Sequence, residues 1–519
     1  MSNRYIYNLG ILFDEVCKKH KDSIALHYNK KHFVTFSDLK DLSNSIANYL
    51  LSSGISRGDV VAIFNTKSEF AFSVMIACLK IGAIYTNLDL TSPWERISKI
   101  LSKCKPKIVV KDYLDNKVLD KALIEDGYSV IDLHSVEFQN EFKRCFSEKL
   151  DINHEINGSN PAYIMFTSGS TGFPKGAVMS HQNLINFIGW GKERFDVKPD
   201  DAFTNVNPIY FDNSVFDFYT AIFTGTRLVV FPNDAAKDVR GMLDKINELK
   251  CTIWFSVPSF LVYLITTKIL NKNEFKHIRK ISFGGEGFPK PRLKYLYDLY
   301  KERAEFVNVY GPTECTCICS SYKITEKDFD NMSELAPLGF LAPNFDYEII
   351  PIDENDKTYG ELCLKGPNVG LGYYGDEELT RKSFIKNPYN SMLDEKIYKT
   401  GDIVKKADNG YLLFKGRIDN QIKHMGYRIE LEEIESVINT LEYVNESAVL
   451  YKKEENGIGQ ILAFVNSKSR KDSAQIGKDL KSKLPPYMKP KKIIVMEELP
   501  KNRNGKTDKL QLKELLKEL

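Results

Sequence analysis

Short apolar runs alternate with amphipathic stretches over much of the chain. Residues 35–55 carry apolar side chains at helical spacing, and "DVVAIF" (residues 59–64) has the length and composition of a buried strand. The alternation returns between residues 220 and 300, where helical patterns separate three strand-like runs: "TRLVVF", "CTIWFSV" and "KISFGG". Strands that alternate with helices predict parallel sheets with helices on both faces.

The pattern changes twice in the second half of the chain. Between residues 335 and 415 it consists of short strands and turns, such as "GELCLKGPNVGLGYY", which predicts a small β-rich subdomain. After Arg417 helical and strand patterns alternate again, over enough residues for a small domain. The sequence therefore predicts an α/β protein with two domains. Residues 1–418 would form a large domain of α/β subdomains plus the β-rich subdomain, and residues 419–519 a small α/β C-terminal domain.

Composition narrows the class of protein. A hydrophobic content of 43% and an aromatic content of 12% over 519 residues are typical of a globular protein with more than one core. The net charge of +3 gives no indication of nucleic acid or an anionic membrane as partner. The chain contains no run of ~18 apolar residues that could span a bilayer. The first twenty residues lack the apolar core of a signal peptide. Nine cysteines without a secretory signal predict free thiols in the cytoplasm.

The stretch "IMFTSGSTGFPKGAV" (residues 164–178) has the chemistry of a phosphate-binding loop without the Walker pattern. Pro174 stands where that pattern has Gly, and Gly176 where it has Ser or Thr. Glycines turn backbone N–H groups toward one point, and the hydroxyls and the lysine add further donors, so the loop suits an anion. The alternative is a polar turn between a strand and a helix. The residues predicted to bind phosphate are Thr167, Ser168, Gly169, Ser170, Thr171, Gly172 and Lys175.

Three cysteines are grouped in "ECTCICSS". Cys315, Cys317 and Cys319 occupy alternate positions, which would place them on one face if the segment is a strand. Metal knuckles prefer C-x-x-C pairs with a second pair elsewhere, and the chain has no such pairs. These cysteines are therefore expected to line or back a site as small residues.

The phosphate loop is the first of eight motifs that follow one another across residues 163–509. In this order the series resembles the adenylate-forming enzymes, which include acyl-CoA synthetases, luciferases and the adenylation domains of nonribosomal peptide synthetases. "VTFSDL" and "LKIGAIYTNLD" near the start also fit, so the resemblance covers nearly the whole chain. The motifs are "YIMFTSGSTGFPKGAVMSH", "YFDNSVFD", "FGGEGF", "VYGPTE", "GELCLKGPNVGLGYY", "YKTGD", "GRIDNQIKHMGYRIELEEIE" and "NRNGKTDK".

The resemblance implies a two-step reaction. A carboxylate joins the α-phosphate of ATP to give an acyl-adenylate and pyrophosphate, and a thiol then takes the acyl group. Glu314 would bind Mg²⁺, because hard oxygen suits that ion. Thr313 would bond the α-phosphate, Tyr310 would lie against the adenine, and Asp402 would accept both ribose hydroxyls. Besides the loop, the implied ATP- or AMP-binding residues are Gly285, Glu286, Val309, Tyr310, Gly311, Thr313, Asp402, Arg417 and Lys506.

The resemblance also implies a moving C-terminal domain. Lys506 would bridge the substrate carboxylate and the α-phosphate, so it is a predicted catalytic residue with Thr313 and Lys423. Asp419 stands at the family's hinge, about which the small domain would swing after adenylation, withdrawing Lys506 and presenting "KHMGYR". Gly426 would then leave room for a pantetheine arm. The alternative is that "GRID" is an ordinary surface turn.

The motif "YFDNSVFD" separates branches of the family. Asp212 matches the carboxylate with which amino-acid-activating members hold the substrate's α-ammonium; a capping or salt-bridge role is the alternative. The implied side-chain pocket is apolar, and Gly284 is expected to leave space in it. It resembles pockets for isoleucine or valine, and its small polar residues would also admit threonine. The predicted substrate-binding residues are Asp212, Asn213, Phe216, Phe255, Ser282, Gly284, Val309, Cys317 and Ile318.

The family resemblance also suggests which molecule accepts the acyl group and which alternative functions are possible. No segment with a phosphopantetheine serine follows Lys506, so the enzyme is expected to load a separate carrier protein. D-alanine–carrier protein ligases are near relatives of similar length, although they tend to have cysteine where this chain has Gly284. A CoA ligase for a small carboxylic acid is a second alternative, and an inactive nucleotide-binding regulator is a non-enzyme alternative.

Overall fold

The computed structural model describes residues 5–145, 155–169, 172–353, 355–452, 459–467, 473–501 and 507–518. The chain divides into two compact units. The large unit comprises Met1–Leu88, Cys104–Met165 and Gly176–Ile418, and the small unit comprises Asp89–Lys103, Phe166–Lys175 and Asp419–Leu519. The sequence did not indicate that two early segments, one of them the phosphate loop, would group with the C-terminal residues.

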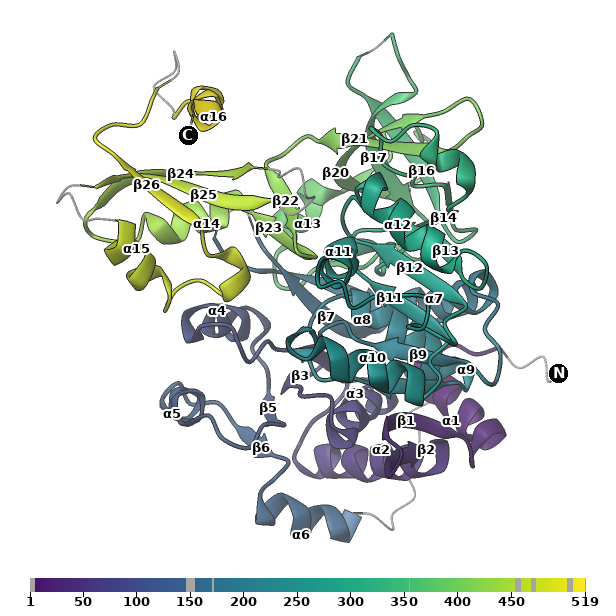
Figure 1. Cartoon of the computed structure of the whole chain (residues 1–519). Coiled ribbons are helices and arrows are strands. Elements are labelled where there is room, and N and C mark those ends of the chain that lie inside the picture. Colours follow the sequence, from purple (N-terminus) through teal and green to yellow (C-terminus); the bar gives the residue numbers. More distant parts are fainter. Residues whose placement is uncertain are drawn as a thin grey trace. The chain divides into compact units, whose positions relative to one another are not determined.

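Two broad sheets carry the large unit (Figure 1). Their central strands are parallel, as expected, while β2, β14, β15 and β18 pair antiparallel at or next to an edge. The nine-stranded sheet has the order β15 (Phe340–Leu341), β14 (Ser320–Lys323), β13 (Glu305–Tyr310), β12 (Lys280–Gly284), β11 (Ile253–Ser256), β9 (Ala202–Asn205), β10 (Arg227–Val230), β1 (Ile24–Asn29) and β2 (His32–Thr35). The seven-stranded sheet has the order β18 (Gly372–Tyr373), β8 (Lys175–Ser180), β7 (Pro161–Thr167), β4 (Ile84–Asn87), β3 (Val60–Phe64), β5 (Ile108–Lys111) and β6 (Val130–Asp132).

The predicted β-rich part is an antiparallel sheet of five strands. Its strands are β16 (Asp346–Pro351), β17 (Tyr359–Lys365), β20 (Lys396–Lys406), β19 (Phe384–Lys386) and β21 (Leu412–Arg417), the last paired with β20. Strands β20 and β21 bring two of the predicted nucleotide-binding residues, Asp402 and Arg417, directly opposite each other.

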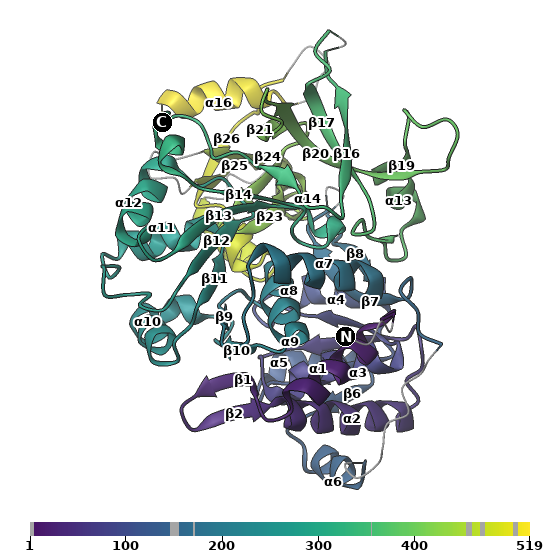
Figure 2. The same cartoon turned by 90° about the vertical axis from the view of Figure 1, so that its right-hand side faces the viewer.

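Helices connect the strands of the two broad sheets. Figure 2 shows α10, α11 and α12 along one side of β11, β12 and β13. The α2 helix begins where the sequence provides a capping box, in which the Thr35 and Asp38 side chains each accept the other's backbone N–H. The helices of this unit are α1 (Leu9–His20), α2 (Phe36–Ser52), α3 (Glu69–Ile81), α5 (Lys117–Glu125), α6 (Val136–Cys145), α7 (His181–Arg194), α8 (Asn213–Val215), α9 (Ala221–Thr224), α10 (Val239–Glu248), α11 (Pro258–Thr266), α12 (Lys290–Tyr300) and α13 (Glu377–Ser383).

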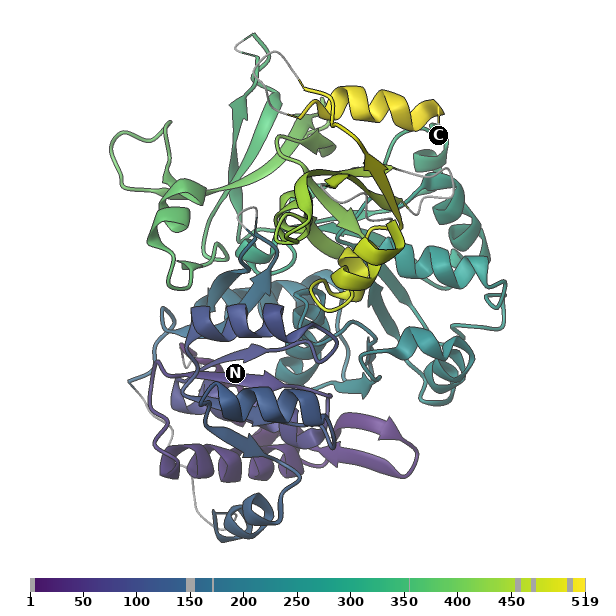
Figure 3. The same ribbon diagram turned by 90° about the vertical axis from the view of Figure 1, so that its left-hand side faces the viewer.

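The small unit has its own sheet and core. Strands β24 (Val444–Lys452), β25 (Gln460–Ser467) and β26 (Lys492–Met496) form a three-stranded sheet, drawn in yellow-green and yellow in Figure 3, and β22 (Gln421–His424) pairs with β23 (Tyr427–Glu430). Apolar side chains of α14 pack with the sheet in one core cluster, and those of α16 in another. The helices are α4 (Trp94–Cys104), α14 (Leu431–Ile438), α15 (Ser473–Leu480) and α16 (Lys509–Glu518).

The predicted α/β class is confirmed, with a large N-terminal part that includes a β-rich sheet and a smaller C-terminal part. In the part of the chain that the structure describes, no helix combines the length and the apolar character that a membrane span needs. The nine cysteines are free thiols, and all except Cys145 are buried.

Candidate active site

The predicted ribose ligand lies in a buried hydrogen-bonded group in the large unit. Asp402, on β20, accepts a bond from the Tyr310 hydroxyl at 2.6 Å and pairs with Arg417 on β21. The Asp402 side chain is only 3% exposed, and the guanidinium compensates its buried charge. Burial, together with the Asp402 charge, holds the pKa of Tyr310 well above its usual range, so the phenol is a donor at neutral pH. A carboxylate offers about four lone-pair directions, so acceptors remain for ribose hydroxyls.

The predicted metal ligand, Glu314, is fully buried beside a tyrosine. It lies in a short 3₁₀ turn, Thr313–Cys315, and accepts a 2.7 Å bond from the hydroxyl of Tyr373 on β18. No group of three His, Cys, Asp or Glu side chains that could hold a metal occurs among the described residues. Glu314 supplies one carboxylate, and Mg²⁺ in nucleotide enzymes is held by one or two carboxylates with phosphate and water as the other ligands, so its chemistry fits the predicted role.

The predicted ammonium ligand lies next to the predicted α-phosphate ligand. Asp212 precedes α8, and its carboxylate accepts the Thr313 hydroxyl although the two residues are 101 positions apart. The helical segment continues from α8 as a π-helical turn, Phe216–Thr220, before α9 begins. Such turns are rare and occur frequently at functional sites.

Four of the predicted pocket residues lie on the neighbouring strands β11, β12 and β13, where Phe255 is opposite Ser282 and Gly284 is opposite Val309. For Gly284 and Ser282 the structure shows a structural role. A Cβ atom at Gly284 would lie 2.4 Å from the Val309 carbonyl oxygen, so packing against β13 requires glycine. The expected free space at this glycine is therefore filled by Val309. The Ser282 hydroxyl donates to the Trp254 carbonyl at 2.7 Å, so it is already engaged. The Phe216 and Phe255 rings contact each other, with centroids 5.3 Å apart.

The segment with the three cysteines is not a strand. After the 3₁₀ turn, Thr316 and Cys317 have φ of 59° and 70°, and β14 begins only at Ser320. The condition for a shared face, that the segment is a strand, is therefore not met. Left-handed backbone is costly for a β-branched residue, and such positions cluster at active sites. This backbone conformation determines the path of the chain through the predicted pocket positions Cys317 and Ile318, both of which are buried.

Three further predicted nucleotide-binding positions lie at backbone turns or helix ends. The Glu286 carboxylate accepts the backbone N–H of Ser259 at 2.7 Å, at the start of α11. Gly285 has φ of 92°, a conformation that favours glycine. At Gly311 a Cβ atom would lie 2.3 Å from the Cys317 carbonyl oxygen, so this glycine permits a close backbone approach.

The phosphate loop belongs to the small unit, where its donors bind a segment from β23 and α14. Ser168 donates to the Arg428 carbonyl at 2.7 Å and accepts the Glu430 N–H at 3.1 Å. The Gly169 N–H donates to Glu433 at 3.3 Å, and Lys175 pairs with Glu430 at 3.2 Å. Thr167 ends β7, and Gly172 has φ of 79°. Ser170 and Thr171 lie outside the described residues.

The other predicted catalytic and hinge positions are also in the small unit. Lys423 lies on β22, and Met425 and Gly426, with φ of 53° and 81°, form the two-residue turn to β23. Positive φ at both residues of a two-residue hairpin loop is typical of a type I′ turn. The turn therefore favours glycine at position 426, independently of any role in binding. The Asp419 carboxylate accepts the Gln421 N–H at 3.2 Å. Lys506 lies outside the described residues.

Several residues of these groups were missed by sequence reasoning. Tyr373 lies in "GLGYY", the end of one of the eight motifs, and that motif could have indicated it. Glu430 and Glu433 lie in "RIELEEIE", where their spacing indicated only an amphipathic helix. Arg96, which pairs with Glu433 across 337 positions, had no signal in its surroundings.

Comparisons with known proteins show which family the chain resembles. The AMP-binding enzyme family matches residues 13–374, and the AMP-binding enzyme C-terminal domain matches residues 433–506. A D-alanine–D-alanyl carrier protein ligase of Bacillus licheniformis is 31% identical over 95% of this chain and 96% of its own length. Bacitracin synthase 1, from the same species, is 31% identical over 97% of this chain, which spans only 9% of the synthase. The solved structure of the Vibrio cholerae adenylation domain AlmE aligns with a TM-score of 0.79 at 23% identity, covering 100% of this chain and 99% of that one.

The chain belongs to the AMP-binding enzyme family. The resemblance to adenylate-forming enzymes that the motifs indicated is thereby confirmed. The roles of the individual site residues stay predictions.

Proposed function

We propose that the protein is an ATP-dependent, AMP-forming ligase that activates an amino acid and transfers it to the phosphopantetheine thiol of a carrier protein. Membership of the AMP-binding enzyme family supports the use of ATP. The relative named a D-alanine–D-alanyl carrier protein ligase supports both the amino-acid substrate and the carrier. The match to one part of a bacitracin synthase is consistent with the same chemistry.

One observation carries the proposal of an amino acid over a simple carboxylic acid. Asp212, the predicted ammonium ligand, accepts the hydroxyl of Thr313, the predicted α-phosphate ligand. An α-amino acid carries its ammonium and carboxylate on one carbon, so the residue that binds the ammonium must lie beside the position of the α-phosphate. Asp212 satisfies this condition. A half-buried carboxylate next to a triphosphate would be costly in an enzyme whose substrate brings no cation.

The proposed reaction has two steps. In the first, a carboxylate oxygen of the amino acid forms a bond to the α-phosphorus, and the bond to the bridging oxygen breaks, releasing pyrophosphate. In the second, the carrier's thiolate sulfur bonds to the acyl carbon and AMP leaves. Asp212 holds the ammonium, Asp402 and Arg417 hold the ribose side, and the loop donors at Gly169 and Lys175 bind the outer phosphates.

Two further groups complete the proposed site. Glu314, oriented by the Tyr373 hydroxyl, would hold a Mg²⁺ ion, which neutralises phosphate charge and polarises the phosphoryl oxygens. Lys506, which the resemblance assigns to the bridge between carboxylate and α-phosphate, would stabilise the charge that develops there.

The proposed substrate is an amino acid with an uncharged, branched aliphatic side chain, such as isoleucine or valine. Phe216, Phe255, Val309 and Ile318 are buried and apolar, and the Ser282 hydroxyl is engaged with the backbone, which favours an aliphatic side chain over a polar one. D-alanine is the second candidate, because the carrier protein ligase matches nearly end to end. Val309 fills the space beside Gly284, which favours a smaller substrate than a free glycine position would.

The test is ATP–pyrophosphate exchange with a panel of acids. L-isoleucine, L-valine, D-alanine and L-alanine are compared with the acids that lack the amino group, such as 3-methylpentanoate and 3-methylbutanoate. We expect the wild type to prefer one of the amino acids. Preference for a deaminated acid would favour the CoA-ligase alternative, and no exchange with any acid would favour the nucleotide-binding regulator.

Substitution of Asp212 makes this test specific. In Asp212→Ala, and in Asp212→Asn, which keeps the shape and loses only the charge, exchange with the preferred amino acid should fall by about 10²-fold or more. The matching deaminated acid should become a relatively better substrate, since no carboxylate is left unpaired. An equal loss for both acids would contradict an ammonium-binding role.

A further inference from the structure

The donors of the phosphate loop are occupied by acidic groups of the same unit. The backbone N–H of Gly169 donates to one oxygen of Glu433, and the ammonium of Lys175 pairs with Glu430. Both carboxylates are buried, with side chains 4% and 6% exposed. Glu430 and Glu433 stand three positions apart at the start of α14, so one short segment supplies both anions.

Each carboxylate has further partners in the small unit. The second oxygen of Glu433 pairs with Arg96 of α4, and the guanidinium is almost as deeply buried as the carboxylate. Glu430 also accepts the side-chain amide of Gln421, and its backbone N–H donates to Ser168. Buried charges persist only with such compensation. The arrangement is therefore a built anion site in which the protein's own carboxylates are the anions.

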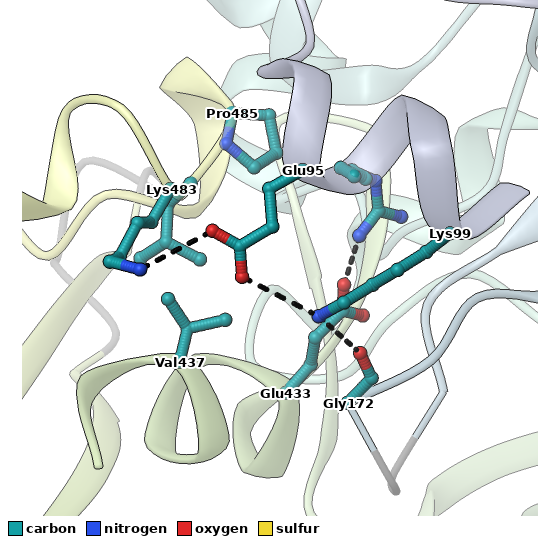
Figure 4. A pocket seen from close by; sticks show the side chains of 9 residues that line it. Glu95, Lys99, Gly172, Glu433, Val437, Lys483 and Pro485 are labelled. Atoms are coloured by element: carbon teal, nitrogen blue, oxygen red, sulfur yellow. Dashed lines mark hydrogen bonds and ion pairs between the residues drawn. The ribbon is translucent and has the colours of Figure 1, made fainter. Parts of the chain in front are cut away.

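A half-exposed set of charges surrounds the buried pair (Figure 4). Lys99 reaches the Gly172 carbonyl at 3.4 Å and lies over the Phe173 ring, 5.1 Å from its centroid. Glu95 pairs with Lys99 at 3.8 Å and with Lys483 at 3.4 Å. Figure 4 shows these side chains converging on one small pocket beside Glu433 and Gly172. Because exposed pairs contribute little, the buried Arg96–Glu433 contact is the one on which the arrangement depends.

The loop cannot bind these carboxylates and a triphosphate at the same time. Gly169 and Lys175 are the donors proposed for the outer phosphates of ATP, and each is engaged by a carboxylate. A phosphate placed against Glu430 and Glu433 would put like charges together in a buried region, where an uncompensated charge is strongly unfavourable. The two anions are therefore mutually exclusive.

We propose that residues 428–433 act as an internal anion that closes the phosphate loop, and that ATP binds only after Glu430 and Glu433 have left it. The inference rests on the proposed use of ATP. It adds that the carboxylates of Glu430 and Glu433 compete with ATP for the donors at Gly169 and Lys175. Once pyrophosphate has departed, return of the carboxylates would block its rebinding and so favour the forward transfer of the acyl group. Arg96 acts as a positioning residue, because it holds Glu433 against the loop.

The test measures direct binding of α,β-methylene-ATP with Mg²⁺ by calorimetry, without amino acid. Apparent affinity falls by the fraction of molecules in the competent state, so if about nine in ten molecules are closed, release tightens binding about 10-fold. We expect this tightening in Glu433→Gln and in Arg96→Gln. Inorganic pyrophosphate alone should bind more tightly to the same variants.

A matched control and a second variant make the outcome decisive. Glu432→Gln removes the same charge from the same helix, from a side chain that contacts Asn420 and Lys509, and should leave the Kd unchanged. The double variant Arg96→Met with Glu433→Leu replaces the ion pair by apolar side chains, a change that often preserves stability, and should also bind ATP more tightly.

The outcomes separate the two proposals. Unchanged or weaker nucleotide binding in the folded double variant would overturn the closure of the loop. Weaker binding in Arg96→Gln with tighter binding in Glu433→Gln would make Arg96 a phosphate ligand and also overturn it as stated. No binding by the wild type or any variant would overturn the use of ATP and the closure together.

Discussion

The hydrogen bond between Tyr373 and Glu314 provides a test of the proposed Mg²⁺ site. The Tyr373 hydroxyl donates to a Glu314 oxygen at 2.7 Å, and both side chains are buried. Tyr373→Phe removes only this oxygen and leaves the ring in place against Phe384, whose centroid is 5.6 Å away. The substitution therefore tests orientation of the carboxylate with little change in packing.

The size of the effect follows from the bond that is lost. A hydrogen bond to a charged group contributes about 1.5–3 kcal/mol, and about 1.4 kcal/mol corresponds to a tenfold change in an equilibrium constant. Partners that orient a metal ligand typically affect metal affinity by about 10- to 100-fold. We therefore expect the Mg²⁺ concentration that gives half-maximal exchange to rise roughly 10-fold or more.

The assay is ATP–pyrophosphate exchange over a range of Mg²⁺ concentrations, with the preferred amino acid at saturation. Tyr374→Phe is the matched control, since it removes the same atom from the next residue, and its Mg²⁺ dependence should equal that of the wild type. A Tyr373→Phe variant with lower activity at every Mg²⁺ concentration but an unchanged midpoint would refute the reasoning. A lower midpoint would mean that the phenol competes with the metal for Glu314.

Two further predictions concern the ribose site and a buried histidine. Asp402→Asn should raise the KM for ATP in the exchange assay by about 10-fold or more, since bonds to a charged acceptor are lost, and leave the KM for the amino acid near the wild-type value; a parallel rise in both would contradict a ribose-specific role. Burial lowers the pKa of His181 to about 4, and its Nδ1 accepts the Leu9 N–H at 3.0 Å. As pH falls from about 6.5 to 4 the unfolded chain binds the additional proton, so the free energy of unfolding should fall by up to about 3 kcal/mol. His181→Asn keeps an acceptor for Leu9 and does not titrate; its melting temperature should fall less over this range, and parallel curves would contradict the assignment.

Strands and helices whose patterns are local were predictable from the sequence. The runs "TRLVVF", "CTIWFSV" and "KISFGG" contain β10, β11 and β12, because each has apolar residues of strand length bounded by turns. The Cys315–Cys319 segment was not predictable in this way. Alternate spacing fits a strand, but a 3₁₀ turn and two left-handed residues follow instead, and tertiary contacts such as Thr316 to the Asn368 carbonyl at 2.8 Å hold them.

The sequence indicated a set of candidate site residues, whose roles stay predictions, but not the contacts that these residues make. The motifs indicated Asp212, Thr313, Glu314 and Asp402, which the structure describes as two hydrogen-bonded groups and a carboxylate–phenol pair. The pairing of Arg96 with Glu433 joins positions 337 residues apart. No local period encodes such a pair, because an arginine on one amphipathic helix and a glutamate on another each look like ordinary surface residues.

A site for ATP and an amino acid must hold charged groups of both signs, and each requires compensation when no substrate is bound. In the large unit Asp402 has Arg417 and a phenol, whereas Asp212 has the Thr313 hydroxyl among its contacts. In the small unit the loop's donors have the carboxylates of Glu430 and Glu433. A hydroxyl is a weaker partner for a carboxylate than an ammonium, because the ammonium adds the attraction of a full opposite charge to the hydrogen bond. In the proposed function, an incoming ammonium would therefore replace Thr313 at Asp212 and free the threonine for the α-phosphate at the moment the amino acid binds.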